Sequence, residues 1–532
     1  MTLFDDLSED LGSLSITVAR FVLRNALPLL FGLLAFLMVR QHVRRRNMPP
    51  GPRGLPLIGN KHQVPTIKPW RKFAEWSKEY GPIFSLHLGS TPVIVLGTAQ
   101  AAWDLLEKRS NIYSSRPRFV VAGEILSDNM RGLMLPNANE RWRKWRKVLH
   151  SGFHARRADD YKEIQSLECI VLLHELLTDP VNYERHLQRF AASVATSVTY
   201  GRRVESVDEW IVKENMEAMD YLTSVNIPGK YLVESWPWLL ELPRFLQWFR
   251  REPEERRQRD IVLLTSLLED VKKRMADGTA PDCLTSQTVN EQEKNGMSDL
   301  EIAYAVSSPF GAGIETTAGT LCVFFLAMLH YPDVMRKAQA ELDNIVGQDR
   351  LPDYRDREKL PYIQALINET LRWRPIAALG GTPHAVTEDD VYQGMYIPKG
   401  STVFANLAGI MHDPVMFPSP DEFRPERFLE TDDPRLRDFE LPFGFGRRIC
   451  VGMHLAANSL YIAIARILWA FDILPATDEH GEEILPDRWD FTNGFNSKPV
   501  SFRCKVKPRT IKVAECLLRE WEGTKDRLGK WQ

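Results

Sequence analysis

The sequence predicts a mainly α-helical fold with a small β subdomain, arranged as a single large domain behind an N-terminal membrane anchor. Helical periodicity dominates after residue 97. Strand-like runs are confined to two patches, at 83–96 and 391–403. An uncharged apolar run precedes this body, and no linker, repeat or low-complexity tract divides it after residue 60.

Length and composition limit the classes of protein that need to be considered. Of the 532 residues, 44% are hydrophobic and 26% are charged, a balance that excludes disordered and collagen-like chains. The 68 basic and 70 acidic residues give a formal charge of −2, so no global basic field indicates nucleic-acid binding. Six scattered cysteines without a C-x-x-C pair fit neither a disulfide scaffold nor a zinc site, and they suit a reducing compartment.

The N-terminal segment, residues 1–47, is predicted to be a membrane anchor. Residues 26–39 carry no charge, and the apolar character extends back to Leu14, although a span needs about 20 residues. Acidic residues precede this run and four arginines follow it within 40–46, which places the rest of the chain in the cytosol. The alternatives are an interfacial or buried helix and a signal peptide, but a signal peptide would need a basic start.

The segment after the anchor, residues 48–60, is predicted to be a hinge. Its sequence MPPGPRG at 48–54 cannot continue a helix and favours a stiff, extended spacer. The large domain, residues 61–532, follows. It opens with a helix predicted over 70–80, and two short apolar runs separated by GSTP predict a β-hairpin within 83–96.

The longest predicted helix runs from Ser298 to His330. A capping box of Ser298 and Glu301 begins it, and Pro332 prevents its continuation. At 1.5 Å per residue it would be about 50 Å long and cross the whole domain. Its middle, PFGAGIETT at 309–317, combines poor helix formers and predicts a distortion where a ligand approaches or a carbonyl is freed. The alternative is a packing kink beside a crossing helix.

One cysteine carries the strongest chemical signal. Cys450 lies in the loop FGFGRRICVG at 443–452, before a helix predicted over 453–470. The N–H groups at the start of that helix, with Arg447 and Arg448, would stabilise a thiolate. A nucleophile would need a neighbouring base, which the sequence does not clearly offer, and one thiolate cannot hold zinc. It can bind a haem iron, because the porphyrin supplies four nitrogens.

The spacing F-x-x-G-x-R-x-C-x-G in this loop resembles the haem-binding loop of the cytochrome P450 family. Three further motifs also resemble that family: ETLR at 369–372, PERF at 425–428 and AGIETT at 312–317. The resemblance covers about residues 49–515. It implies a cytochrome P450-type domain with a haem b cofactor, in which Cys450 is the axial ligand of the iron.

The resemblance also implies roles for other residues. Glu315 and Thr316 would form the catalytic relay that delivers protons to bound oxygen. The haem would be bound by loop residues and propionate partners, namely Phe443, Arg448, Trp142, Arg146 and His384. For His384, an ordinary packed or surface histidine is the alternative. A buried structural triad of charges is also implied, formed by Glu369, Arg372 and Arg427.

Two segments bear on the substrate and one group of residues bears on the partner. The aromatic segment 236–249 would face the membrane, with an ordinary core as the alternative, and residues 119–135 predict an apolar pocket. The chain has no flavin or dinucleotide motif. We therefore expect an NADPH-dependent flavoprotein reductase to dock on a basic face formed by Arg143, Lys144, Lys147 and Arg447. The alternative is that these four residues are ordinary solvated surface charges without a partner.

As a whole, the resemblance implies a monooxygenase on the endoplasmic reticulum membrane that uses dioxygen to oxidise a lipophilic small molecule. The segments 397–400 and 491–495 are similar to those of microsomal fungal family members that act in secondary metabolism. Substrates with terpenoid, polyketide-aromatic or indole scaffolds all remain possible. A haem-thiolate isomerase or dehydratase and a haem-binding sensor are the alternatives. The Glu315–Thr316 pair counts against the isomerase or dehydratase, whereas the sensor would give binding spectra without NADPH consumption.

Overall fold

The computed structural model describes residues 47–226, 230–494 and 496–529, together with Pro28 and Gly32. The predicted membrane anchor, residues 1–47, lies outside the described residues apart from Pro28, Gly32 and Asn47. Within the described part, the helices at 299–330 and 453–470 are long and apolar enough to cross a bilayer, but 78% and 72% of their most apolar windows are buried inside the protein. Both are core helices.

The fold is mainly helical, as predicted. The helices are α2 (Pro69–Tyr80), α3 (Ala99–Ala102), α4 (Ser110–Tyr113), α5 (Glu140–Phe153), α6 (Ala155–Asp160), α7 (Lys162–Thr178), α8 (Tyr183–Tyr200), α9 (Trp210–Val225), α10 (Leu232–Ser235), α11 (Arg251–Ala276), α12 (Leu284–Asn290), α13 (Gln292–Asn295), α14 (Asp299–Val306), α15 (Ser308–His330), α16 (Pro332–Ile345), α17 (Pro361–Trp373), α18 (Leu407–Ile410), α19 (Pro434–Arg437), α20 (Met453–Ala470) and α21 (Ile511–Leu528). Short π-helical and 3₁₀ turns connect them, including η2 (Val120–Ile125), η10 (Leu441–Phe443) and η11 (Gly446–Arg448).

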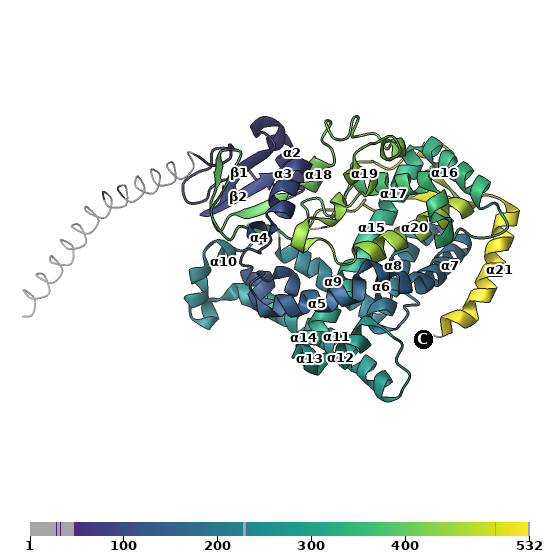
Figure 1. Ribbon diagram of the computed structural model, residues 1–532, viewed down its shortest axis with the longest axis horizontal. Coiled ribbons are helices and arrows are strands. Elements are labelled where there is room, and N and C mark those ends of the chain that lie inside the picture. Colours follow the sequence, from purple (N-terminus) through teal and green to yellow (C-terminus); the bar gives the residue numbers. More distant parts are fainter. Residues whose placement is uncertain (1–27, 29–31, 33–46, 227–229, 495, 530–532) are drawn as a thin grey trace, which may run out of the picture.

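Three small sheets complete the fold of the part of the chain that the structure describes. Their strands are β1 (Ile83–Leu88), β2 (Thr91–Leu96), β3 (His384–Ala385), β4 (Asp390–Tyr392), β5 (Met395–Ile397), β6 (Thr402–Ala405), β7 (Phe471–Thr477), β8 (Glu483–Ile484) and β9 (Cys504–Pro508). The orders are β1-β2-β6-β3, β4-β5 and β8-β7-β9. Figure 1 places β1, β2 and α2 at one end of the molecule and α21 at the opposite end.

The predicted hairpin is confirmed, with a tighter turn than expected. β1 and β2 pair antiparallel, and the chain reverses at Gly89, whose φ of 64° suits glycine. Thr91 and Pro92, expected in the turn, belong to β2. β6 then pairs in parallel with β2, which joins the two strand-like patches of the sequence into one sheet. The β7–β8–β9 sheet was not predicted.

The predicted long helix is divided. Ser298 and Glu301 form the expected capping box, and the helical run ends at His330. The interruption, however, lies at Ser307, between α14 and α15, because Pro309 lacks the N–H that would continue the ladder. Residues 309–317 themselves are α-helical, so the distortion predicted there is wrong in position.

The core is built around α15 and α20. Residues 321–329 of α15 and 458–470 of α20 are all buried, and α7, α8 and α17 pack against them. At the far end, α21 covers α7, with Val513, Cys516 and Leu517 buried. The rings of His174 in α7 and Trp521 in α21 stack with centroids 4.5 Å apart.

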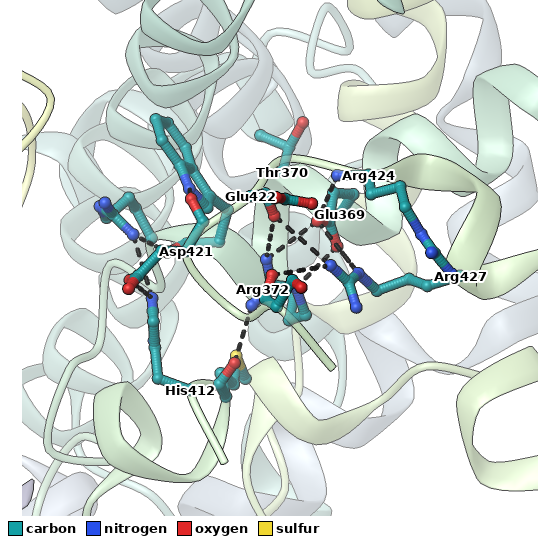
Figure 2. A network of polar contacts seen from close by, with 12 residues as sticks. Glu369, Thr370, Arg372, His412, Asp421, Glu422, Arg424 and Arg427 are labelled. Atoms are coloured by element: carbon teal, nitrogen blue, oxygen red, sulfur yellow. Dashed lines mark hydrogen bonds and ion pairs between the residues drawn. The ribbon is translucent and has the colours of Figure 1, made fainter. Parts of the chain in front are cut away.

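The buried triad of charges is found as predicted (Figure 2). Glu369 accepts from Arg372 Nε at 2.6 Å and Nη2 at 2.9 Å, and Arg427 Nε lies 3.1 Å from the same carboxylate. Arg372 also donates to the carbonyl oxygens of Met411 and Glu422. This ion triad therefore fixes α17 against the segment 411–427, well away from solvent.

Candidate functional site

The loop that carries Cys450 is folded tightly against the start of α20. The Cys450 N–H donates to the carbonyl oxygen of Phe443 at 2.8 Å, which closes the turn formed by η10 and η11. Gly446 has a φ of 53°, and a Cβ there would lie 2.5 Å from the Leu106 carbonyl oxygen. Only glycine fits this approach. The half-buried Phe443 contributes its backbone to the loop.

The environment of Cys450 differs in part from the expectation. Its side chain retains accessible surface, although surrounding protein raises the pKa of the thiol by burial. The Gly452 N–H and the charge of Arg146 oppose that rise in pKa. Arg447 is exposed and does not contribute as predicted. A bound metal ion would deprotonate the thiol outright, because coordination favours the thiolate.

Three arginines gather near this loop from different parts of the chain. Arg146 of α5 donates through both terminal nitrogens to the Ile449 carbonyl oxygen, at 3.0 Å each. Arg448 donates to the carbonyl oxygens of Ser114 and Leu135 at 2.8 and 2.6 Å. Sequence reasoning missed the third residue, Arg116, which is 6% exposed. We call Arg116, Arg146 and Arg448 the cationic cluster.

The arginines of the cationic cluster have no carboxylate to neutralise them: within residues 47–226, 230–494 and 496–529, none of them takes part in an ion pair. Burial lowers the pKa of Arg448 to about 8, with a further contribution from the charges of Arg116 and Arg146. Burial alone lowers the pKa of Arg116 to about 9. Guanidinium groups keep their charge in proteins, so the lowered pKa values reflect the cost of burying these cations without a carboxylate.

Two buried donors at the cluster also lack partners. Among the described residues, Trp142 Nε1 and Arg448 Nη1 have no hydrogen-bond acceptor, and the Arg448 guanidinium lies 4.4 Å from the centre of the Trp142 ring. Buried donors without acceptors are rare in native proteins. Two carboxylates, such as the propionates of a haem, would neutralise these cations and satisfy these donors, so the residues present fit the group.

His384 lies beside the cluster and is buried. Its Nδ1 lies 2.8 Å from the Tyr113 carbonyl oxygen, so in the neutral ring Nδ1 donates and Nε2 is an acceptor. Burial, together with the charges of Arg116 and Arg448, holds the pKa of His384 well below its usual range. The alternative of a surface histidine is therefore excluded, and the ring is neutral unless an anion approaches it.

The structure does not join Glu315 and Thr316 to one another. Thr316 Oγ1 donates to the Ala312 carbonyl oxygen one turn earlier in α15 at 2.7 Å. Glu315 Oε2 accepts from Asn496 Nδ2 at 2.8 Å and lines a different cavity from the one described next. The pair thus occupies adjacent positions with separate hydrogen-bond partners.

A cavity of about 600 Å³ leads to the cationic cluster. Its wall includes Arg116 itself and residues from the β1–β2 sheet, η2 and α10. The wall mixes apolar and polar groups, among them Val120, Leu379, Phe404, Lys61 and Glu234. The apolar pocket predicted from 119–135 is thus present in part, because Phe119 and Val120 line the cavity while Ile125 and Leu126 pack into the core.

The aromatic segment at 236–249 is exposed rather than part of the core. Trp238, Phe245 and Trp248 are 60%, 84% and 66% exposed. Only Leu239 and Phe249 of this segment are buried apolar residues. Lys61 at the cavity wall donates to Ser235 at 2.6 Å, so this apolar surface adjoins the cavity.

The basic residues expected on the partner face lie on and near α5. Arg143, Lys147 and Arg447 are exposed, and none of them forms an ion pair with a residue that the structure describes. Lys144 does, with Glu140 at 3.3 Å. Three of the four predicted cations are therefore free of carboxylate partners on this surface.

Comparison with known proteins identifies the family. A profile described as Cytochrome P450 matches residues 49–506. Cytochrome P450 monooxygenase 58 of Postia placenta is 43% identical over 502 residues, which cover 93% of this chain and 95% of that protein. Cytochrome P450 monooxygenase claR of Ampulloclitocybe clavipes is 39% identical over 482 residues, 89% of each chain. A zebra fish cytochrome P450 solved with abiraterone has a TM-score of 0.67 at 25% identity, covering 83% of this chain and 100% of its own. The chain therefore belongs to the cytochrome P450 family, oxidoreductases of the monooxygenase type that hold haem b through a cysteine thiolate.

Proposed function

We propose that this cytochrome P450 is a membrane-anchored monooxygenase that oxidises a lipophilic small molecule in fungal secondary metabolism, with dioxygen and electrons from NADPH. The observation that carries the proposal is the accessible Cys450 beside a buried cationic cluster with no carboxylate of its own. Residues 1–47 form the anchor, 48–60 the hinge and 61–532 the catalytic domain. The fungal relatives support the wider setting.

The residues that hold the cofactor follow from this site. Cys450 would hold the haem iron through its thiolate, and the Phe443 carbonyl and the Gly452 N–H set the loop around its sulfur. The cationic cluster and the free N–H of Trp142 bind the propionates. The haem, when bound, supplies the activation of dioxygen that leads to insertion of one oxygen atom.

His384 has a distinct role at this site. Its neutral ring offers only an acceptor at Nε2, because Nδ1–H is engaged by the Tyr113 carbonyl. A propionate close to Nε2 favours the protonated ring, which then donates from both nitrogens. His384 is thus charged when the site is filled and neutral otherwise.

Glu315 and Thr316 supply the protons that oxygen activation consumes. The Thr316 hydroxyl rests on the Ala312 carbonyl and can turn to donate elsewhere. The Glu315 carboxylate takes up protons and passes them on toward Thr316. An isomerase or dehydratase would not need such a pair.

The substrate enters through the 600 Å³ cavity. The exposed side chains of Trp238, Phe245 and Trp248 belong to the segment that contributes Pro237 to the cavity wall, and they rest in the interfacial layer of the endoplasmic reticulum membrane. A lipophilic molecule can then reach the cavity from the membrane. Electrons arrive from a flavoprotein reductase that docks on Arg143, Lys147 and Arg447.

The test uses membranes that contain the full-length chain, a fungal flavoprotein reductase and NADPH. They are incubated with lipophilic fungal extract under ¹⁸O-labelled dioxygen, and the products are analysed by mass spectrometry. A product that gains one labelled oxygen supports the proposal. A changed product without label would indicate the isomerase or dehydratase, and a thiolate-type carbon monoxide spectrum with no NADPH consumption would indicate a haem-binding sensor.

A further inference from the structure

A second cavity, of about 270 Å³, lies against α15. It is bounded by α8, α9, α15 and the C-terminal segment that includes Thr492 and residues 498–501. On α15, Gly311, Glu315 and Gly319 line it at a spacing of four residues, so they form one stripe along the helix. Thr316 is not among the lining residues, since adjacent positions on a helix point about 100° apart.

The two glycines of this stripe allow neighbouring groups to close around Glu315. A Cβ on Gly311 would lie 3.0 Å from Met219 Sδ in α9. A Cβ on Gly319 would lie 3.2 Å from Lys498 Cβ and 3.1 Å from Ile376 Cδ1. All three distances are shorter than ordinary contacts. The helix therefore lacks side chains at the two positions where α9 and Lys498 approach the carboxylate.

Two side chains of the C-terminal segment hold the Glu315 carboxylate. Asn496 Nδ2 donates to Oε2 at 2.8 Å, and Lys498 Nζ lies 3.9 Å from Oε1. The segment is itself closed by two bonds: Thr492 N donates to the Lys498 carbonyl at 2.8 Å, and Lys498 N donates to Thr492 Oγ1 at 3.1 Å. Both partners thus come from one closed loop rather than from free side chains.

The charges around the cavity suit a path for protons. Lys498 is the only cation among the lining residues, all of which are described, whereas Glu184, Asp220 and Glu315 are acids. Glu315 and Lys498 keep 25% and 28% of their side-chain surface exposed. Although much of its wall is apolar, a cavity of this size that carries three acids and a lysine has room and polar partners for several water molecules.

We propose that Asn496 and Lys498 are positioning residues for Glu315, and that this second cavity brings protons from solvent to its carboxylate. Glu315 accepts a proton from water on the cavity side, rotates away from Asn496 and Lys498, and releases that proton on the Thr316 side of α15. It then returns to its two partners as a carboxylate, so no net charge accumulates. This inference rests on the proposed oxygen-activating function and adds the residues that control its proton supply.

The experiment measures how dioxygen is divided between two products in the absence of an organic substrate. Reduction to hydrogen peroxide consumes one NADPH and one proton per dioxygen, whereas reduction to two waters consumes two of each. Poor proton delivery therefore shifts the products from water to peroxide. The haem-loaded full chain is mixed with a flavoprotein reductase and NADPH, and NADPH, dioxygen and peroxide are followed together.

The variants are Lys498→Met, Asn496→Ala and Lys498→Arg, with Lys507→Met in β9 as the control lysine. We expect Lys498→Met and Asn496→Ala each to raise the peroxide-to-water ratio by about three- to tenfold, the range expected for a lost polar contact. Lys498→Arg should restore the ratio and Lys507→Met should leave it unchanged. Unchanged ratios in the first two variants, or an equal shift in the control, would overturn the inference.

A second readout does not depend on turnover. In a double-mutant cycle, Glu315→Gln and Lys498→Met should be non-additive in the unfolding equilibrium by at least about twofold, because the two groups interact directly. Additive effects would count against the positioning role. A wild-type protein with a thiolate-type carbon monoxide spectrum that oxidises no NADPH would instead overturn the proposed function, and this inference with it.

Discussion

Two groups of buried arginines in this chain have opposite electrostatic arrangements. In the ion triad, Arg372 and Arg427 share the carboxylate of Glu369, and their other N–H groups reach backbone carbonyls. In the cationic cluster the guanidinium groups reach only backbone carbonyls, and Arg448 keeps a donor without a partner. The first group is neutralised by a carboxylate of the chain, whereas the second has no carboxylate partner among the residues that the structure describes.

This difference separates structural from ligand-binding charge. A paired buried network fixes the geometry of the elements that it joins and is costly to break. An unpaired buried cluster is costly to keep, because the lost hydration is not replaced. A chain that retains such a cluster therefore depends on a ligand to neutralise it. Four predictions test this difference between the two groups.

The largest effect should come from the ion triad. Glu369→Gln leaves two buried arginines without a carboxylate and should lower the free energy of unfolding by about 3–5 kcal/mol. Denaturant titration of the haem-loaded protein measures this loss. Glu430→Gln, which removes an exposed partner of Arg424, is the control and should cost less than about 1 kcal/mol. Equal losses in both variants would contradict the structural role.

The opposite sign is expected in the cationic cluster. Arg448→Met removes a buried charge, so it should stabilise the haem-free protein, yet it should weaken haem binding by about ten- to a hundredfold through the lost contacts to a charged group. Haem transfer to apomyoglobin measures the second effect. The exposed neighbour provides the control variant, Arg447→Met. If Arg448→Met destabilises the haem-free protein as Glu369→Gln does, the contrast between the two groups fails.

Acid should distinguish the two regions through one histidine in each. Burial holds the pKa of His384, at the cationic cluster, well below 6.5 and lowers that of His412, near the triad, to about 4. Below pH 6.5 the unfolded chain therefore binds more protons, and the haem-free protein should lose up to about 1.4 kcal/mol of stability per pH unit from each histidine. His384→Asn should remove one of these contributions.

Haem binding should remove the loss of stability in acid that comes from His384, because propionates would keep this histidine protonated in the folded state. The loss that comes from His412 should remain. Unfolding measured between pH 6.5 and 4.5 with and without haem tests this. An acid dependence of stability that is identical in the two forms would contradict a propionate next to His384.

The smallest effect should come from charges on the surface. Arg447→Gln and Lys147→Gln should slow electron transfer from the reductase by about two- to fivefold at low ionic strength and little at high salt. Stability should change by less than about 0.5 kcal/mol. Stopped-flow reduction measures the rate, with Lys507→Gln as the matched control. A rate that is insensitive to salt in every variant would exclude this face as the docking surface.

Local signals made much of the fold predictable. The capping box of Ser298 and Glu301, the turn at Gly89 and the loop around Cys450 each depend on residues a few positions apart. The β7–β9 pairing joins segments about thirty residues apart through short strands, and such pairings leave weak periodicity. The interruption at Ser307 was displaced from the expected position because proline acts on the preceding turn.

The candidate site was predictable where a motif carried it and not elsewhere. Arg116 belongs to no motif, and its position depends on contacts with the distant Thr382 and Pro383 carbonyls. An arginine three residues before the apolar segment 119–135 was the only local signal for it. Asn496 and Lys498 were also missed, because their contact with Glu315 crosses about 180 residues of sequence. Contacts of this range arise from the packed fold alone.

The helix α21 lies beyond the end of the family profile but belongs to the folded domain. The family profile ends at residue 506, but the hydrophobic core continues through Val513, Cys516 and Leu517, which cover α7. The inherited module and the cooperative folding unit therefore have different ends. A chimera that exchanges only the profile region between two relatives would leave α7 covered by a helix from the other protein or by none. The helix α21 should therefore be exchanged together with the domain that it covers.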